Sequence, residues 1–208
     1  MSITSYEQMN SMELDVLKEI GSIGTGNAAT ALSTLLNTKI KMSMPEVSVL
    51  GYNEAINKMG GPEKIVAGVM SRISGEINGI MLYTQELDSI NTMLQGVLAD
   101  KIENYFQLNE MEISAIIEVG NIIISSYMNA ITSLAGITAN LSVPGISINM
   151  LGGILAVPMV EYGYESNKIL SIGGKLSMDE KILESNLILL PDVKSLNHLF
   201  QKLGIKHD

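Results

Sequence analysis

Apolar residues recur with the spacing of an amphipathic helix in two long segments of this chain. The first segment covers 10–37, where Ser11 suits the start of a helix and Asn37 its end, and the second covers 110–134. The positions on the apolar side are Leu17, Ile20, Gly24, Ala28 and Leu35 in the first segment and Ile116, Val119, Ile123, Tyr127 and Leu134 in the second. Both segments are therefore predicted to be long helices that bury one side.

Shorter apolar runs, separated by Gly, Pro and Asn, predict strands in both halves of the chain. The predicted strands are 40–50, 63–73 and 75–83 in the first half and 138–150, 154–162, 168–177 and 182–190 in the second, and a short helix is predicted at the end of each half, at 85–97 and 192–203. Strands that follow one another without a crossover helix pair mainly antiparallel. The predicted fold class is therefore α+β, with a mainly antiparallel sheet and the two long helices on one face.

The two halves match each other in one constant register. Residues of the first half recur 99 positions later without a gap, as Glu13 does at Glu112. The matched pairs are Glu13/Glu112, Glu19/Glu118, Gly21/Gly120, Ile23/Ile122, Ala31/Ala130, Leu35/Leu134, Ser43/Ser142, Pro45/Pro144 and Ser48/Ser147. The repeat is too long for a solenoid unit and has only two copies. We predict a single domain over 1–208, with internal repeats at about 10–98 and 109–204 related by a pseudo-two-fold axis.

Each predicted long helix carries a narrow polar stripe opposite its apolar side. The stripe is Asp15, Glu19 and Ser22 in the first helix and Ser114, Glu118 and Asn121 in the second. Side chains at i, i+4 and i+7 stack along two turns, so one partner surface can contact all three. Any amphipathic helix has a polar side, but here glutamate keeps its place in both copies and the second helix has almost no other polar surface. The stripe is therefore predicted to be functional.

Composition limits the chemistry available to such a site. The chain has 208 residues and no Cys, which excludes thiolate metal sites and Cys nucleophiles. Its only histidines are His198 and His207, near the end of the chain, which disfavours a His-based active site. The formal charge of -9 argues against binding to nucleic acid or to anionic membrane surfaces. Any catalysis must use carboxylates, amides or hydroxyls.

One uncharged stretch, 119–160, is long enough to contain a membrane-spanning helix. Asn, Pro and Gly interrupt it repeatedly, which favours a buried core over a membrane span. The start of the chain is polar and lacks an apolar signal region, so we expect no secretory signal and a cytoplasmic location.

Two other features have ordinary structural explanations. The run Gly24–Thr25–Gly26–Asn27–Ala28–Ala29 resembles a shortened dinucleotide fingerprint, but it follows no strand and lies within a helical pattern. Its small residues are therefore predicted to allow close helix packing. The fourteen methionines are scattered, and those in strand patterns, such as Met44 and Met81, are predicted to fill the core.

The polar stripes resemble the signature of the CheC–FliY–CheX phosphatase family: Asp or Ser, three residues, Glu, two residues, Asn, twenty-two residues, Pro. Ser114, Glu118, Asn121 and Pro144 match it at every position and spacing. In the first half Asp15, Glu19 and Pro45 match, but Ser22 stands where the family has Asn. The segment EIGSIGTGNAATALSTLL also resembles the first helix of CheC-type members, and two motif copies in about 200 residues suit that type.

The resemblance implies a chemotaxis phosphatase that hydrolyses the aspartyl phosphate of the response regulator CheY. Asn121 would orient the attacking water, and Glu118 would pair with a lysine of the receiver domain. Ser114 would assist docking, and Pro144 would shape the start of a strand. No cofactor of its own is implied, because Mg²⁺ comes with the receiver domain. The first site, with Ser22 in place of Asn, is predicted to be weak or inactive, which leaves one active site in the second half.

The resemblance also implies a second partner, the receptor deamidase CheD. Two alternatives stay open at this stage. One is a non-catalytic adaptor that binds phosphorylated CheY or CheD through the same helices, and the degenerate first site favours it. The other is a structural component of the flagellar switch, although the chain has no room for an appended switch domain.

Overall fold

One eight-stranded sheet lies at the centre of the computed structural model, which describes residues 5–95, 97–98, 101–162, 168–178 and 181–205. The strands are β1 (Ile40–Met42), β2 (Glu46–Gly51), β3 (Ile65–Gly75), β4 (Gly79–Glu86), β5 (Ala139–Leu141), β6 (Gly145–Met150), β7 (Lys168–Met178) and β8 (Lys181–Pro191). Their order is β1-β7-β8-β4-β3-β5, with β2 also paired to β7 and β6 also paired to β3. Every pairing among these strands is antiparallel.

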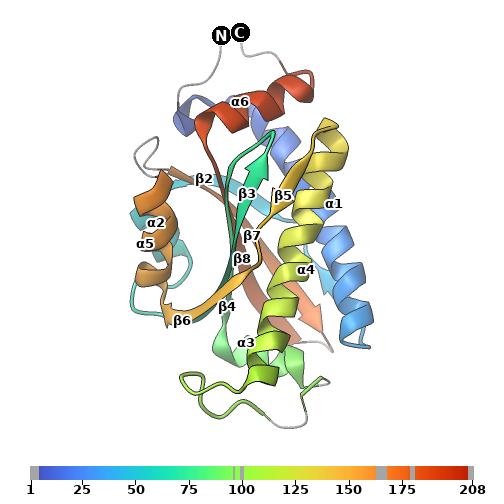
Figure 1. Cartoon of the computed structure of the whole chain (residues 1–208), viewed down its shortest axis with the longest axis vertical. Helices are drawn as coiled ribbons and strands as arrows, with labels where there is room; N and C mark the ends of the chain where they lie inside the picture. The colour runs from blue at the N-terminus through green and yellow to red at the C-terminus, as the bar shows by residue number, and fades with distance from the viewer. Residues whose placement is uncertain (1–4, 96, 99–100, 163–167, 179–180, 206–208) are drawn as a thin grey trace.

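The two long helices lie side by side on one face of the sheet and run in opposite directions (Figure 1). The helices are α1 (Ser11–Leu35), α2 (Tyr52–Lys58), α3 (Leu87–Leu94), α4 (Glu110–Ala135), α5 (Leu151–Tyr162) and α6 (Val193–Lys202), with a short 3₁₀ helix η1 (Tyr6–Gln8) before α1. The shorter helices α2 and α5 lie on the other side of the sheet (Figure 1). The predicted α+β class, with a mainly antiparallel sheet and two long helices on one face, is confirmed.

The halves exchange strands. From the first half, β2 pairs with β7 of the second, with Glu46 opposite Gly173. In the equivalent place, β6 pairs with β3, with Gly145 opposite Met70. The two halves then join through the β4–β8 ladder at the middle of the sheet. Each half therefore completes the sheet of the other.

A proline interrupts each of the strands predicted at 40–50 and 138–150, so each forms two short strands instead of one. Proline has no N–H to donate to a ladder. A serine two residues before the proline bridges the break: Ser43 Oγ accepts from Lys175 N at 3.0 Å, and Ser142 Oγ accepts from Arg72 N at 3.0 Å. The repeated serines thus hold the interruption in place in both halves.

Asparagine caps both long helices in the same way. Asn10 Oδ1 accepts from Glu13 N at 3.0 Å, while a Glu13 carboxylate oxygen accepts from Asn10 N at 2.8 Å. Asn109 and Glu112 form the same pair of bonds at 3.0 and 2.8 Å. These capping boxes satisfy two N–H groups at each helix start. The first helix therefore begins one residue after Asn10, close to the predicted start.

The strand predicted at 154–162 is wrong, because this segment belongs to helix α5. Its buried residues are Leu151, Ile154, Leu155 and Pro158, which is the i, i+3, i+4, i+7 spacing of a helix. Outside contacts satisfy the first turn, where Leu151 N donates to Lys64 O at 2.8 Å. In the first half, α2 occupies the equivalent place, although no helix was predicted there.

The apolar sides of α1 and α4 are buried except near their last turns, where Leu35 and Leu134 are 36% and 43% exposed. Among the described residues, α4 is the one helix long and apolar enough to cross a membrane. Its apolar residues Ile116, Val119, Ile123 and Tyr127 are all buried within the protein. Core packing against the sheet and α1 accounts for this composition.

Candidate functional site

The polar stripe of α4 lies on the outer surface of the protein. Ser114 and Glu118 are exposed and Asn121 is half-buried. Within the described part of the chain, neither Ser114 nor Glu118 makes a side-chain hydrogen bond or ion pair. Asn121 Oδ1 accepts a hydrogen bond from Ser125 Oγ at 3.3 Å. The helix therefore presents a carboxylate and a carboxamide, one turn apart, to whatever binds this face.

Close packing beneath the stripe fixes how α4 is rotated. A Cβ atom at Gly120 would lie only 2.5 Å from Val69 Cβ of β3, so the helix backbone rests directly on the sheet at this turn. Any larger residue at Gly120 would have to push the helix outward. Because Glu118 and Asn121 flank this contact, the sheet positions both side chains.

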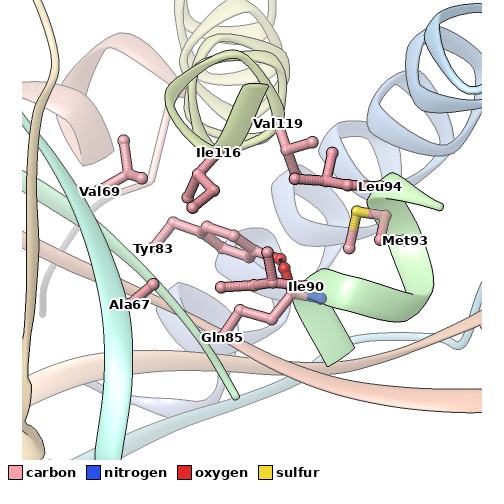
Figure 2. A pocket seen from close by; sticks show the side chains of 9 residues that line it. All are labelled: Ala67, Val69, Tyr83, Gln85, Ile90, Met93, Leu94, Ile116 and Val119. Atoms are coloured by element: carbon pink, nitrogen blue, oxygen red, sulfur yellow. Dashed lines mark hydrogen bonds between the residues drawn. The ribbon is translucent and has the colours of Figure 1, made fainter. Parts of the chain in front are cut away.

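The cavity beneath this part of α4 is too small to be a ligand site. Ile116 and Val119 close it from above, and Tyr83 and Gln85 of β4 line its floor (Figure 2). Its volume is about 10 Å³, room for at most one water. Tyr83 donates to Gln85 Oε1 at 2.8 Å, and burial raises the pKa of Tyr83 above its ordinary range. Chemistry at this helix must therefore take place on its outer face.

The stripe of α1 differs from that of α4 in its hydrogen bonds. Ser22 Oγ donates to the Lys18 carbonyl at 3.0 Å, so its hydroxyl is engaged with the helix backbone. Lys18 also forms an ion pair with Asp15 at 2.7 Å, whereas the equivalent position of α4 is Ile117. Glu19 is exposed, like Glu118. The first stripe thus keeps its glutamate but carries an added cation and has no carboxamide.

The two motif prolines lie immediately before β2 and β6. Pro45 is buried against α1: a Cβ at Gly21 would meet its Cγ at 3.0 Å, next to Ser22. Pro144 is half-buried. The residues just before them, Met44 and Val143, are 84% and 91% exposed. The prolines thus bring an exposed apolar residue to the same place in each half.

The expectation that methionines fill the core is confirmed for Met81, which is fully buried, and is wrong for Met44. Met12 and Met111, which precede the stripe residues at equivalent positions of α1 and α4, are also exposed, at 61% and 68%. Met12 and Met111 lie 99 residues apart, in the same register that relates the two halves. This recurrence was the sequence signal that these two methionines do more than fill the core.

Small residues of α1 admit a large side chain from α4, as predicted for the segment 24–29. A Cβ at Gly24 would lie 2.7 Å from Tyr127 Cγ, and Thr25 Oγ1 is hydrogen-bonded to the Tyr127 hydroxyl at 2.6 Å. Burial raises the pKa of Tyr127. Gly24 and Thr25 therefore pack against α4 and tie the two stripe-bearing helices together at this point, whereas Gly26 is exposed and a Cβ there would meet nothing within 4 Å.

The histidines stand apart from both stripes. His198 on α6 lies 3.4 Å from Glu76, and His207 falls outside the described residues. No group of three or more His, Asp or Glu side chains suited to a metal ion is present in the described ranges.

Comparison with known proteins finds similarity to two phosphatases and to one family model. The model described as the CheC-like family matches residues 12–49, which include the stripe of α1. The CheY-P phosphatase CheC of Bacillus subtilis (strain 168) is 28% identical over 196 residues, which cover 92% of this chain and 94% of that protein. The flagellar motor switch phosphatase FliY of the same organism is 27% identical over 146 residues, which cover 70% of this chain and 38% of that protein.

Solved structures show the same fold. The crystal structure of Thermotoga maritima FliY matches with a TM-score of 0.68 at 18% identity, and the match covers 94% of this chain and 98% of that chain. The likeness therefore extends over both halves of this chain.

Proposed function

We propose that this protein belongs to the CheC-like family and is a chemotaxis phosphatase that hydrolyses the aspartyl phosphate of a CheY-type response regulator. The observation that carries this proposal is the exposed pair Glu118 and Asn121 on one face of α4, in a chain similar along 92% of its length to a CheY-P phosphatase. Acyl phosphates are labile, so catalysis needs mainly a correctly placed water and a docked substrate.

Each stripe residue of α4 has a distinct role in the proposal. Asn121 orients the attacking water, because a carboxamide both donates and accepts hydrogen bonds and stays neutral beside a phosphoryl group. Glu118 carries no partner among the described residues and is free to pair with a lysine of the receiver. Ser114 assists docking at the edge of the face. Pro144, immediately before β6, shapes the start of that strand.

The stripe of α1 serves docking more than hydrolysis in this proposal. Ser22 lacks the carboxamide, and its hydroxyl already donates to the helix backbone. A misplacement of about 1 Å can lower a rate by about 100-fold. This face therefore favours a binding role, and a non-catalytic adaptor for the phosphorylated receiver is the alternative function if α4 is also inactive.

The remaining parts of the proposal concern partners and location. The protein brings no metal of its own, and Mg²⁺ belongs to the receiver domain. The deamidase CheD is a second partner. Because it acts with these two partners, the protein is proposed to be cytoplasmic.

Dephosphorylation of a purified, phosphorylated CheY-type receiver tests the proposal. The unaltered protein should accelerate phosphate release, Asn121→Ala should lower kcat by about 100-fold or more, and Glu118→Ala should mainly raise KM. The matched control is Glu19→Ala, the same change on α1, which should leave most activity intact. If the unaltered protein gives no acceleration with or without CheD, the phosphatase proposal is wrong and the adaptor function remains.

A further inference from the structure

Ser125 differs from seven other serines and threonines in the described helices. Those residues donate back to the carbonyl four positions earlier, as at Ser22, Thr30, Ser33, Thr34, Thr92, Ser126 and Thr132. Ser125 instead donates to the side chain four positions earlier, Asn121 Oδ1, at 3.3 Å. Its hydroxyl is thus directed along the helix surface to the carboxamide of the stripe.

We infer that Ser125 is a positioning residue for the proposed reaction: its hydroxyl holds the oxygen end of the Asn121 carboxamide and leaves the NH₂ end toward the substrate. The terminal torsion of an asparagine side chain is broad and nearly two-fold, so without such a bond either end can face outward. The inference rests on the proposed function, because it assigns Asn121 its part in orienting the water.

The first half of the chain lacks both members of this pair. The positions equivalent to Asn121 and Ser125 are Ser22 and Gly26. Gly26 is exposed, and a Cβ atom there would meet nothing within 4 Å. A serine can therefore be introduced at Gly26 without a clash, so the natural difference between the halves can be reversed by substitution.

The first test removes the hydroxyl from the second half. Ser125→Ala should lower kcat about tenfold with KM unchanged, the loss expected when one ordinary hydrogen bond is absent from the transition state. Ser125→Thr keeps the hydroxyl, so its kcat should stay close to that of the unaltered protein. Ser126→Ala is the control, because the Ser126 hydroxyl donates to the helix backbone, at 2.6 Å from the Ile122 carbonyl.

The second test builds the pair into α1 in an Asn121→Ala background. Ser22→Asn alone should recover little phosphatase activity, and Ser22→Asn with Gly26→Ser should recover at least several-fold more. A kcat unchanged by Ser125→Ala, or equal rates in these two first-half variants, would overturn the inference.

An activity-independent measurement separates this inference from the proposed function. In NMR spectra the two side-chain amide protons of Asn121 should shift and broaden in Ser125→Ala but not in Ser126→Ala. Unchanged Asn121 signals would overturn the positioning role even if the protein proved to be no phosphatase. If these signals shift but the unaltered protein shows no phosphatase activity, the hydrogen bond from Ser125 still positions Asn121. Only the phosphatase proposal is then contradicted.

Discussion

Replacing Gly24 by alanine should force α1 and α4 apart. The new Cβ would lie 2.7 Å from Tyr127 Cγ, 2.8 Å from Cδ1 and 3.0 Å from the Tyr127 Cα. Favourable contacts between carbon atoms lie at about 3.5–4.0 Å. Because one of the three atoms belongs to the backbone, rotation of the tyrosine ring cannot relieve the clash, and the helices themselves must move.

The same helix supplies a matched control two residues later. At Gly26 a Cβ would meet nothing within 4 Å, so Gly26→Ala should only gain helix propensity, about 1 kcal/mol. Gly24→Ala gains the same amount but overpacks the interface, at a cost of about 1–3 kcal/mol. Separation of the helices also strains the 2.6 Å bond between Thr25 and Tyr127, which is worth about 1 kcal/mol. The two variants should therefore differ by about 2–4 kcal/mol in the free energy of unfolding.

Urea unfolding followed by helical circular dichroism measures this difference. The urea midpoint of Gly26→Ala should rise and that of Gly24→Ala should fall, with similar slopes for both. If Gly24→Ala were as stable as Gly26→Ala, the close approach of the two helices at Tyr127 would be refuted.

Three further outcomes follow from the same contacts. Asn109→Ala removes a capping bond from α4 and should lower the free energy of unfolding by about 1 kcal/mol in urea titrations, with Asn129→Ala on the same helix as the control. Tyr127→Phe leaves the buried Thr25 hydroxyl without this partner and should lower the free energy of unfolding by about 1 kcal/mol, measured in the same way. Burial raises the pKa of Tyr105 to about 12, whereas the unfolded chain titrates near 10. Between these values the unfolded chain has lost a proton that the folded chain keeps, so stability should fall as pH rises from about 10 to about 12. Tyr105→Phe should flatten that decline in urea midpoints, and an unchanged slope would contradict the assignment.

The two long helices were predictable because local sequence determines them. Asn109 followed three residues later by Glu112 is a capping box in sequence as well as in structure. The apolar spacing of α4 then continues for seven turns without a proline. Helix α5 is almost entirely apolar, so the spacing of its apolar residues cannot distinguish a helix from a strand. The strand prediction for 154–162 failed for that reason.

The exchange of strands between halves could not be predicted from the repeat. A constant offset of 99 residues shows that two segments are alike, but not whether β2 pairs within its own copy or with β7 of the other. That choice depends on packing between distant parts of the chain. The serine at each break, Ser43 or Ser142, was visible as a repeated residue, yet its bond to the other half appears only in the folded protein.

The polar stripes were located correctly on the outer faces of α1 and α4, since helical spacing alone decides which side chains share a face. Two neighbours with a direct bearing on the stripes were missed. Lys18 lies three residues after Asp15, and Ser125 lies four residues after Asn121, so both were within reach of an i+3 or i+4 search. The direction of the Ser125 hydroxyl, however, is a choice between backbone and side chain that spacing cannot decide.

Strand exchange also explains how one stripe can change while the half that bears it stays intact. The sheet needs β2 to cover β7 and β3 to receive β6, so the first half is structurally required by the second. The stripe of α1 is not required in this way: Asp15 and Glu19 are exposed, and among the described residues Ser22 bonds only to the backbone of its own helix. A substitution at Ser22 or Gly26 therefore alters the outer face without disturbing the sheet on which Asn121 depends. Loss of a carboxamide from the first stripe is consequently tolerated by the fold, whereas loss of β2 or β3 is not.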